Sequence, residues 1–192
     1  MKEYLERHSS IKVKGENMTK QKSIIIALAL ASSFLSGCTH QYKWKEYPIS
    51  DRIPNNSVLQ VRTPVAVING QTDNKVKEIG RIGAHKYQGS EQQLSQAIVD
   101  HLKKELAKNS IQVDDGSSKK LYIKVEHANL VQGVWQVRAD MEVIVTTGDR
   151  IAYKFEIQNS TPTTVPRAYN GAVATAVVDI LNNPKIQAYL RK

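Results

Sequence analysis

The sequence predicts an α+β domain, a two-layer sandwich in which two main helices pack on one face of a mostly antiparallel sheet of four to five strands. Apolar and polar residues alternate through three successive segments between residues 121 and 157, the period of strands with one buried face. Apolar residues recur at helical spacing in two other segments, residues 90–109 and 172–181. The order strand, helix, short strand, three-strand meander and helix favours separate layers of sheet and helices.

The three alternating segments define an apolar face and a charged face. The residues expected to point inward are Leu121, Ile123, Val125, Trp135, Val137, Ala139, Met141, Val143, Val145, Ile151, Tyr153, Phe155 and Ile157. The opposite face is a solvated surface and also a possible binding face, with Lys124, Glu126, Arg138, Asp140 and Glu142. Two further strands are predicted at residues 57–68, where Pro64 indicates an edge or a break, and at residues 111–113.

Two helices are expected to cover the apolar face. Ser90 and Gln93 form a capping-box pattern, and the stripe that follows (Leu94, Ile98, Leu102 and Leu106) ends near Asn109. His101 borders this stripe, and we expect a half-buried surface histidine rather than a ligand. The second helix is expected after Asn170-Gly171, and Pro184 then begins a last helical turn.

The chain divides into four parts. We expect residues 1–17 to be a non-structural extension and residues 18–37 to be a signal peptide. Residues 38–56 are expected to form a linker, and residues 57–192 a single domain. Fully extended, the linker would reach roughly 60 Å. Its aromatic residues, Tyr42, Trp44 and Tyr47, fit either a membrane interface or packing against the domain. The polar stretch 69–88 predicts a long loop, either mobile or functional.

The segment before the only cysteine is typical of an export signal. An apolar run, Ile24–Leu35, follows Lys20 and Lys22 and is too short to span a bilayer, which needs ~20 residues. The ending Leu35-Ser36-Gly37-Cys38 resembles the lipobox of bacterial lipoproteins. The resemblance implies cleavage before Cys38 and a covalent lipid on this residue. The alternatives are an ordinary signal peptide followed by a chance cysteine, and an anchor that is never cut.

Composition narrows the function classes. After residue 37 the chain holds 21 basic and 15 acidic residues, a net charge of +6, which fits solubility or an anionic surface such as lipid headgroups. Nucleic acid is not an expected partner for an exported chain. Once Cys38 carries lipid, no thiol remains for disulfides, so the fold depends on its core.

Part of the chain resembles the YajG-type family of Gram-negative lipoproteins. The similarity lies in residues 93–113, in 121–125 and in 172–190, where an AVATAVVDIL segment is followed by NNPKIQAYL. The layout is also similar to a lipopolysaccharide-assembly lipoprotein and to an activator of penicillin-binding proteins. Thr39 after the cysteine, rather than Asp, resembles the class sorted to the outer membrane. The resemblance implies an outer-membrane lipoprotein whose domain faces the periplasm.

Catalysis is not expected. The histidines have no metal-ligand spacing, and Asp140 and Glu142 lie beside Arg138, which neutralises the face more readily than it creates a general acid. We therefore expect no catalytic residue, no metal and no cofactor apart from the lipid on Cys38. The leading hypothesis is a membrane-anchored accessory module that binds an envelope protein. The alternative is a carrier that holds lipid or glycan between sheet and helices.

Overall fold

The structure is a computed structural model that describes residues 38–162 and 164–192. The predicted extension, residues 1–17, and the predicted signal peptide, residues 18–37 with Leu35, Ser36 and Gly37, lie outside the described residues. A compact unit extends from Thr39 to Lys192. Cys38, the residue before this unit, is exposed.

A four-stranded sheet forms one layer of the domain, and the predicted α+β class is confirmed. Its strands are ordered β2-β5-β6-β7, with bounds Ala66–Asn69, Lys120–Gln132, Val137–Thr147 and Ala152–Thr161. β2 pairs with β5 in parallel, and the other pairs are antiparallel. Along β6 every second residue is buried, as the alternation predicted. Ile151, which was expected to point inward, is exposed because it lies in the turn before β7.

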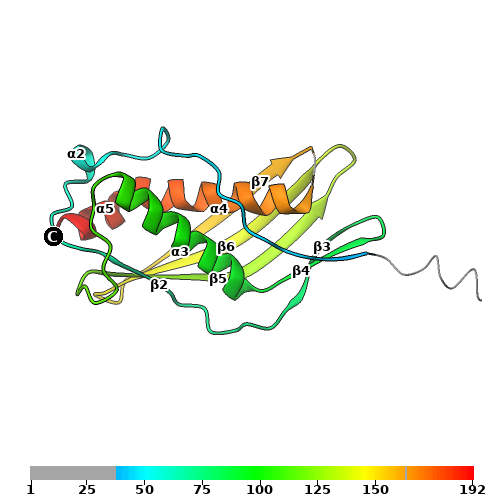
Figure 1. Ribbon diagram of the computed structural model, residues 1–192, viewed down its shortest axis with the longest axis horizontal. Coiled ribbons are helices and arrows are strands. Elements are labelled where there is room, and N and C mark those ends of the chain that lie inside the picture. Colours follow the sequence, from blue (N-terminus) through cyan, green and yellow to red (C-terminus); the bar gives the residue numbers. More distant parts are fainter. Residues whose placement is uncertain (1–37, 163) are drawn as a thin grey trace, which may run out of the picture. The chain divides into compact units, whose positions relative to one another are not determined.

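Two long helices cover the apolar face of this sheet (Figure 1). α3, Glu91–Lys108, begins with the predicted capping box between Ser90 and Gln93. Its apolar stripe is fully buried. α4, Val165–Asn182, is followed by the short α5, Pro184–Arg191. Asn183 caps α5, accepting hydrogen bonds from the N–H groups of Lys185 and Ile186.

Helix α4 begins earlier than predicted, so Asn170 and Gly171 lie inside it. Pro166 stands in the first turn, where a proline costs no helical hydrogen bond. Gly171 faces strand β7, and a Cβ there would collide with the side chain of Asn159. Asn159 in turn donates a 3.0 Å hydrogen bond to the carbonyl of Ala168. The Asn-Gly pair therefore permits close helix–sheet packing rather than a turn.

The segment expected to be a long loop contains a second sheet, so that prediction was wrong. β3, Lys77–Ile82, and β4, His85–Gly89, form a hairpin that turns at Gly83 with φ +56°. β4 also pairs in parallel with β1, Thr39–Gln41. Of the side chains in these strands only Ile79 is a buried apolar one. Backbone pairing with a distant segment therefore forms this sheet without an apolar alternation in the sequence.

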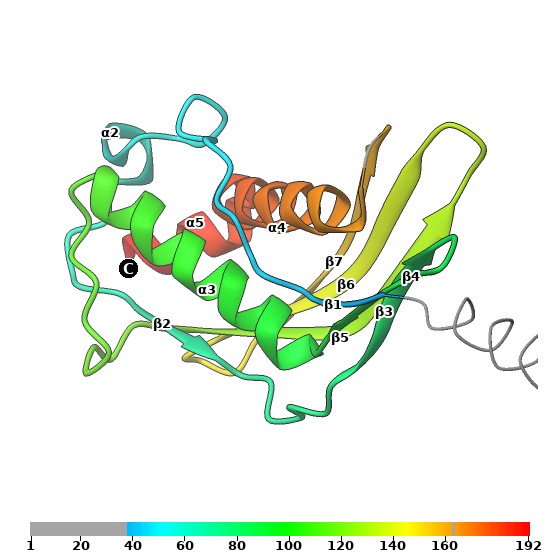
Figure 2. The same cartoon turned by 45° about the vertical axis from the view of Figure 1, so that its right-hand side comes forward.

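Residues 42–53, called here the strap, cross over the two helices instead of extending into solvent (Figure 2). Tyr42, Ile49 and Ile53 are buried. The Tyr42 hydroxyl donates a 2.9 Å hydrogen bond to Asn170 on α4, whose side-chain oxygen also accepts from the Lys45 N–H. Trp44 and Tyr47 pack partly against the core. Of the two interpretations of these aromatic residues, packing on the domain is the one observed.

The strand predicted before α3, at residues 57–68, is shorter than expected, and the one predicted after α3, at residues 111–113, is reduced to a single bridge. Of the predicted strand 57–68 only residues 66–68 form a strand, as part of β2, Ala66–Asn69. Before it lies the short helix α2, Asn56–Leu59, capped by Asn55. Val113 forms an isolated bridge with Val65 rather than a strand. Pro64 lies just before that bridge, where its missing N–H removes no hydrogen bond from the sheet.

A core substitution in the strap tests whether it belongs to the fold. Ile49 is 1% exposed, so Ile49→Ala should lower the free energy of unfolding by about 2–4 kcal/mol through lost burial and a cavity. Denaturant unfolding measures this change. The matched control is Val76→Ala at an exposed position, which should stay within about 0.5 kcal/mol. Equal stability of the two variants would mean that residue 49 belongs to a linker.

Candidate functional site

Backbone hydrogen bonds to β4 fix the first residues of the domain, 39–42. Thr39 stands opposite Lys86 in the parallel β1–β4 pair, and the Tyr42 N–H donates a 2.8 Å bond to the Gln88 carbonyl. Cys38 therefore joins directly to a paired strand. Whatever is attached to this cysteine lies one residue from the folded domain, and not at the end of a 60 Å linker.

The charged residues predicted as a possible binding face do lie together on the face of the sheet opposite the helices. They pair mostly within their own strands. Lys124 bonds Glu126 at 2.9 Å on β5, and Arg138 bonds Asp140 through two contacts of 2.8 and 3.0 Å on β6. Glu142 receives Lys154 from β7 at 2.9 Å. The hydrogen bond from Lys124 lowers the pKa of Glu126. The face thus presents neutralised pairs of both signs.

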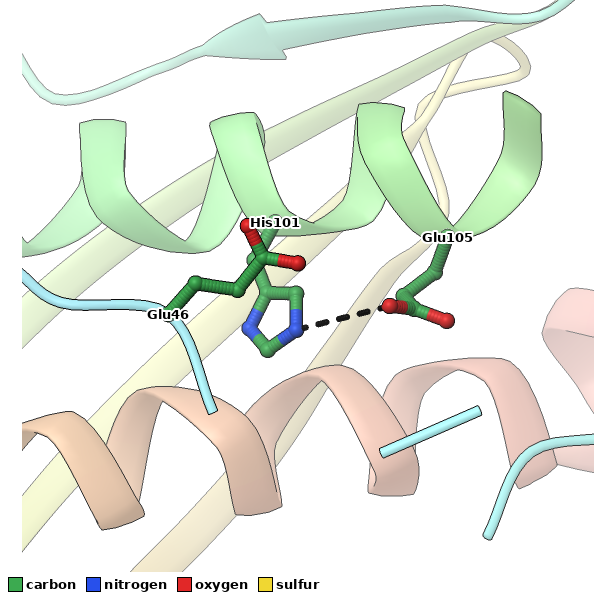
Figure 3. A group of neighbouring side chains, drawn as sticks. All are labelled: Glu46, His101 and Glu105. Atoms are coloured by element: carbon green, nitrogen blue, oxygen red, sulfur yellow. Dashed lines mark ion pairs between the residues drawn. The ribbon is translucent and has the colours of Figure 1, made fainter. Parts of the chain in front are cut away.

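A buried polar cluster lies between the strap and α3 (Figure 3). It consists of Glu46 from the strap and His101 and Glu105 from α3, whose ligand-type atoms lie within 4.8 Å of one another. The side chains of His101 and Glu105 are 0% exposed and that of Glu46 is 27% exposed. The predicted half-buried position of His101 was wrong. The side chain points from α3 toward α4 (Figure 3), and the ring of Trp44 from the strap lies against it, with centroids 5.8 Å apart.

The carboxylates of this cluster are neutralised by lysines of α3. The Lys108 ammonium lies 2.6 Å from Glu105 and 3.3 Å from Glu46, and Lys104 lies 2.6 Å from Glu46. These hydrogen bonds, that from Lys104 above all, lower the pKa of Glu46. Ser50 donates a further 2.9 Å bond to Glu105.

Among the described residues, His101 is the one member of this cluster whose side chain makes no hydrogen bond. Its Nε2 lies 3.7 Å from a Glu105 oxygen, and neither ring nitrogen makes a hydrogen bond. Burial lowers the pKa of His101 although Glu105 and Glu46 act in the opposite direction. One imidazole and two carboxylates are a ligand set that suits zinc. The Lys108 ammonium, however, already lies within bonding distance of both carboxylates, so the cluster chiefly fastens the strap to α3.

A second feature that the sequence did not predict is the connection between β5 and β6. Trp135 was expected to point inward, but it is 86% exposed, as is Val134. β6 begins only at Val137, and the Gly133 N–H donates to the Gln136 carbonyl at 2.8 Å, which closes the turn. The alternation that includes Trp135 therefore continues past the end of the strand. The glycine was the signal for this turn.

Surface hollows occur at both ends of the domain. One of about 330 Å³ lies between residues 133–136 and residues 160–162. Another, of about 360 Å³, lies near the C-terminus and is lined mainly by basic residues: Gln60, Arg62, Thr63, Lys119, Arg191 and Lys192. Lys119 also donates a 2.6 Å bond to the Leu190 carbonyl, and its burial lowers its pKa. Both hollows are open, so they suit contact with a surface more than enclosure of a ligand.

No protein-family model matches the chain, and no curated protein matches it either. Among the described residues, no helix has the length and apolar character needed to cross a bilayer. Interpretation of this site therefore depends on its own geometry.

The buried histidine predicts a pH dependence of stability. Because the folded state binds the His101 proton less tightly than the unfolded chain does, this group's contribution is complete above the ordinary pKa of 6.5 and is lost as the pH falls below it. The slope from one such group is at most ~1.4 kcal/mol per pH unit. His101→Gln should flatten this part of the profile, measured by denaturant unfolding between about pH 7.5 and 5.

Exposed His127 provides the matched control, since His127→Gln removes an imidazole that is not buried. That variant should keep the wild-type slope. If His101→Gln also kept the wild-type slope, protonation of His101 would not be the cause of the loss of stability at low pH.

Proposed function

We propose that this chain is an outer-membrane lipoprotein, anchored by lipid on Cys38, whose α+β domain acts in the periplasm as a non-catalytic accessory module for an envelope protein. The observation that carries the proposal is the Leu35-Ser36-Gly37-Cys38 sequence, followed immediately by strand β1. A cysteine at the very start of a folded unit suits an anchor, because acyl chains attached there hold the whole domain at the bilayer. Two or more such chains give stable attachment.

The interior of the domain favours a module over a carrier. Fully buried side chains from both layers, among them Leu94, Ile98 and Leu102 of α3 and Leu121 and Ile123 of β5, meet between sheet and helices. A carrier for lipid or glycan would need apolar space at this interface. The polar cluster at Glu46 also supports a structural role, since its carboxylates are engaged by lysines. The surfaces left for a partner are the charged sheet face and the two ends.

Metabolic labelling with a fatty acid tests the anchor. The wild-type chain should incorporate label and sediment with the outer membrane, whereas Cys38→Ser should lose the label completely because no thiol remains to accept the lipid. Ser36→Ala is the matched control, since it keeps a small residue two positions before Cys38 and should be labelled normally. Label in the Cys38→Ser chain, or unprocessed wild-type protein in the cytosol, would contradict the proposal.

A further inference from the structure

The β5–β6 connection is the most exposed apolar feature among the described residues. Its residues 131–136 read VQGVWQ and carry no charge. Val134 and Trp135 are each 86% exposed and Val131 is 39% exposed. An indole that extends from a hairpin turn gains nothing from the core of its own domain. A large exposed apolar group of this kind marks a contact with something outside the domain.

This connection lies at the end of the domain where the chain enters from Cys38. Figures 1 and 2 both show the start of the described chain, where strand β1 lies, and the β5–β6 connection at the same end of the domain. The backbone pairing agrees. Thr39 pairs with Lys86, Lys86 with Arg81, and the neighbouring Gly80 approaches the side chain of Leu130 on β5. Leu130 is three residues from the turn at Gly133.

The electrostatic character of this end fits an anionic surface. Three connections lie there, and their described residues (82–85, 131–136, 161–162 and 164) include no aspartate or glutamate. Lys86 and Arg167 border them, and the nearby Glu78 is paired with Arg81. A bilayer with anionic headgroups therefore meets apolar and basic side chains at this end, without acidic ones in the connections.

We propose that Trp135 and Val134 insert into the headgroup region of the bilayer that holds the lipid of Cys38. This inference depends on the proposed anchoring and adds to it the orientation of the domain. Tryptophan is favoured at membrane interfaces because its ring is apolar and its N–H remains hydrated. The anchor keeps the turn at a high local concentration near the surface, so even a small apolar contact is occupied. The domain then has two points of attachment and cannot rotate freely about Cys38.

Tryptophan fluorescence tests the contact in the acylated mature protein, which begins at Cys38, after extraction from membranes and reconstitution into vesicles of phosphatidylethanolamine and phosphatidylglycerol. The chain has two tryptophans, so Trp44→Phe leaves Trp135 as the only one. In vesicles made with lipids brominated on their acyl chains, this emission should lose about half its intensity and shift to the blue, as for an indole at the membrane interface.

The matched control carries Trp44→Phe, Trp135→Phe and Ile151→Trp. Residue 151 is also exposed, but it lies in the β6–β7 turn, at the other end of the sheet (Figure 1). Its emission should be the same in brominated and plain vesicles. Equal quenching at residues 135 and 151 would overturn the inference, because the contact would then lack orientation.

The two proposals fail differently. If the protein floats with the vesicles but Trp135 is not quenched, the anchor stands and the turn does not contact the bilayer; a protein partner or a second copy then becomes its occupant. If Cys38 carries no fatty-acid label and the protein does not float with the vesicles, the proposed anchoring itself is wrong, and the inference is overturned with it.

Discussion

The strap over helices α3 and α4 is the constraint on which the rest of the domain depends. Apolar side chains hold the helices to the sheet, and the strap crosses both helices on the side away from the sheet (Figure 2). Its polar contacts include the hydrogen bond from Tyr42 to Asn170, that from Ser50 to Glu105, and the 3.0 Å bond that the Arg52 carbonyl accepts from Asn182. Glu46 adds ion pairs with Lys104 and Lys108 of α3. Because the strap continues directly into β1, the same contacts determine where the chain enters the domain. An anchor at Cys38 would therefore act on a rigid body.

Burying Glu105 has a cost that the surrounding groups offset. A carboxylate with no access to water is strongly destabilising unless it is paired and hydrogen-bonded. Here Lys108 and Ser50 supply both, and Lys108 extends the pairing to Glu46. Such a network adds little net stability over apolar packing, but removing one partner leaves a buried charge. The cluster thus selects one position of the strap along α3, while apolar contacts such as those of Ile49 provide most of the stabilisation.

The sequence predicts what local patterns encode. The alternation in β6 and the capping box of α3 each depend on residues a few positions apart, and both were confirmed. The β3–β4 hairpin was missed because its pairing partner, β1, lies more than forty residues away and its side chains are mostly polar. His101 and Glu105 stand one helical turn apart, so their proximity could have been predicted. Glu46 could not, since only the folded strap brings it there. Trp135 was misplaced because the alternation runs past the strand into the turn.

The absence of a linker between residue 38 and β1 changes which surfaces remain for a partner. On a linker of roughly 60 Å any face of the domain could meet an envelope protein. The position of a surface relative to the anchor would then not indicate whether a partner can reach it. If the anchor lies beside β1 as proposed, the proposed orientation turns the end that holds Trp135 toward the bilayer and the C-terminal end away from it. That far end carries the basic hollow around Arg62 and Lys119. The paired charges on β5 and β6 lie along the side between the ends. A partner in the periplasm would therefore meet the basic end first, because it is the surface that the proposed orientation presents outward.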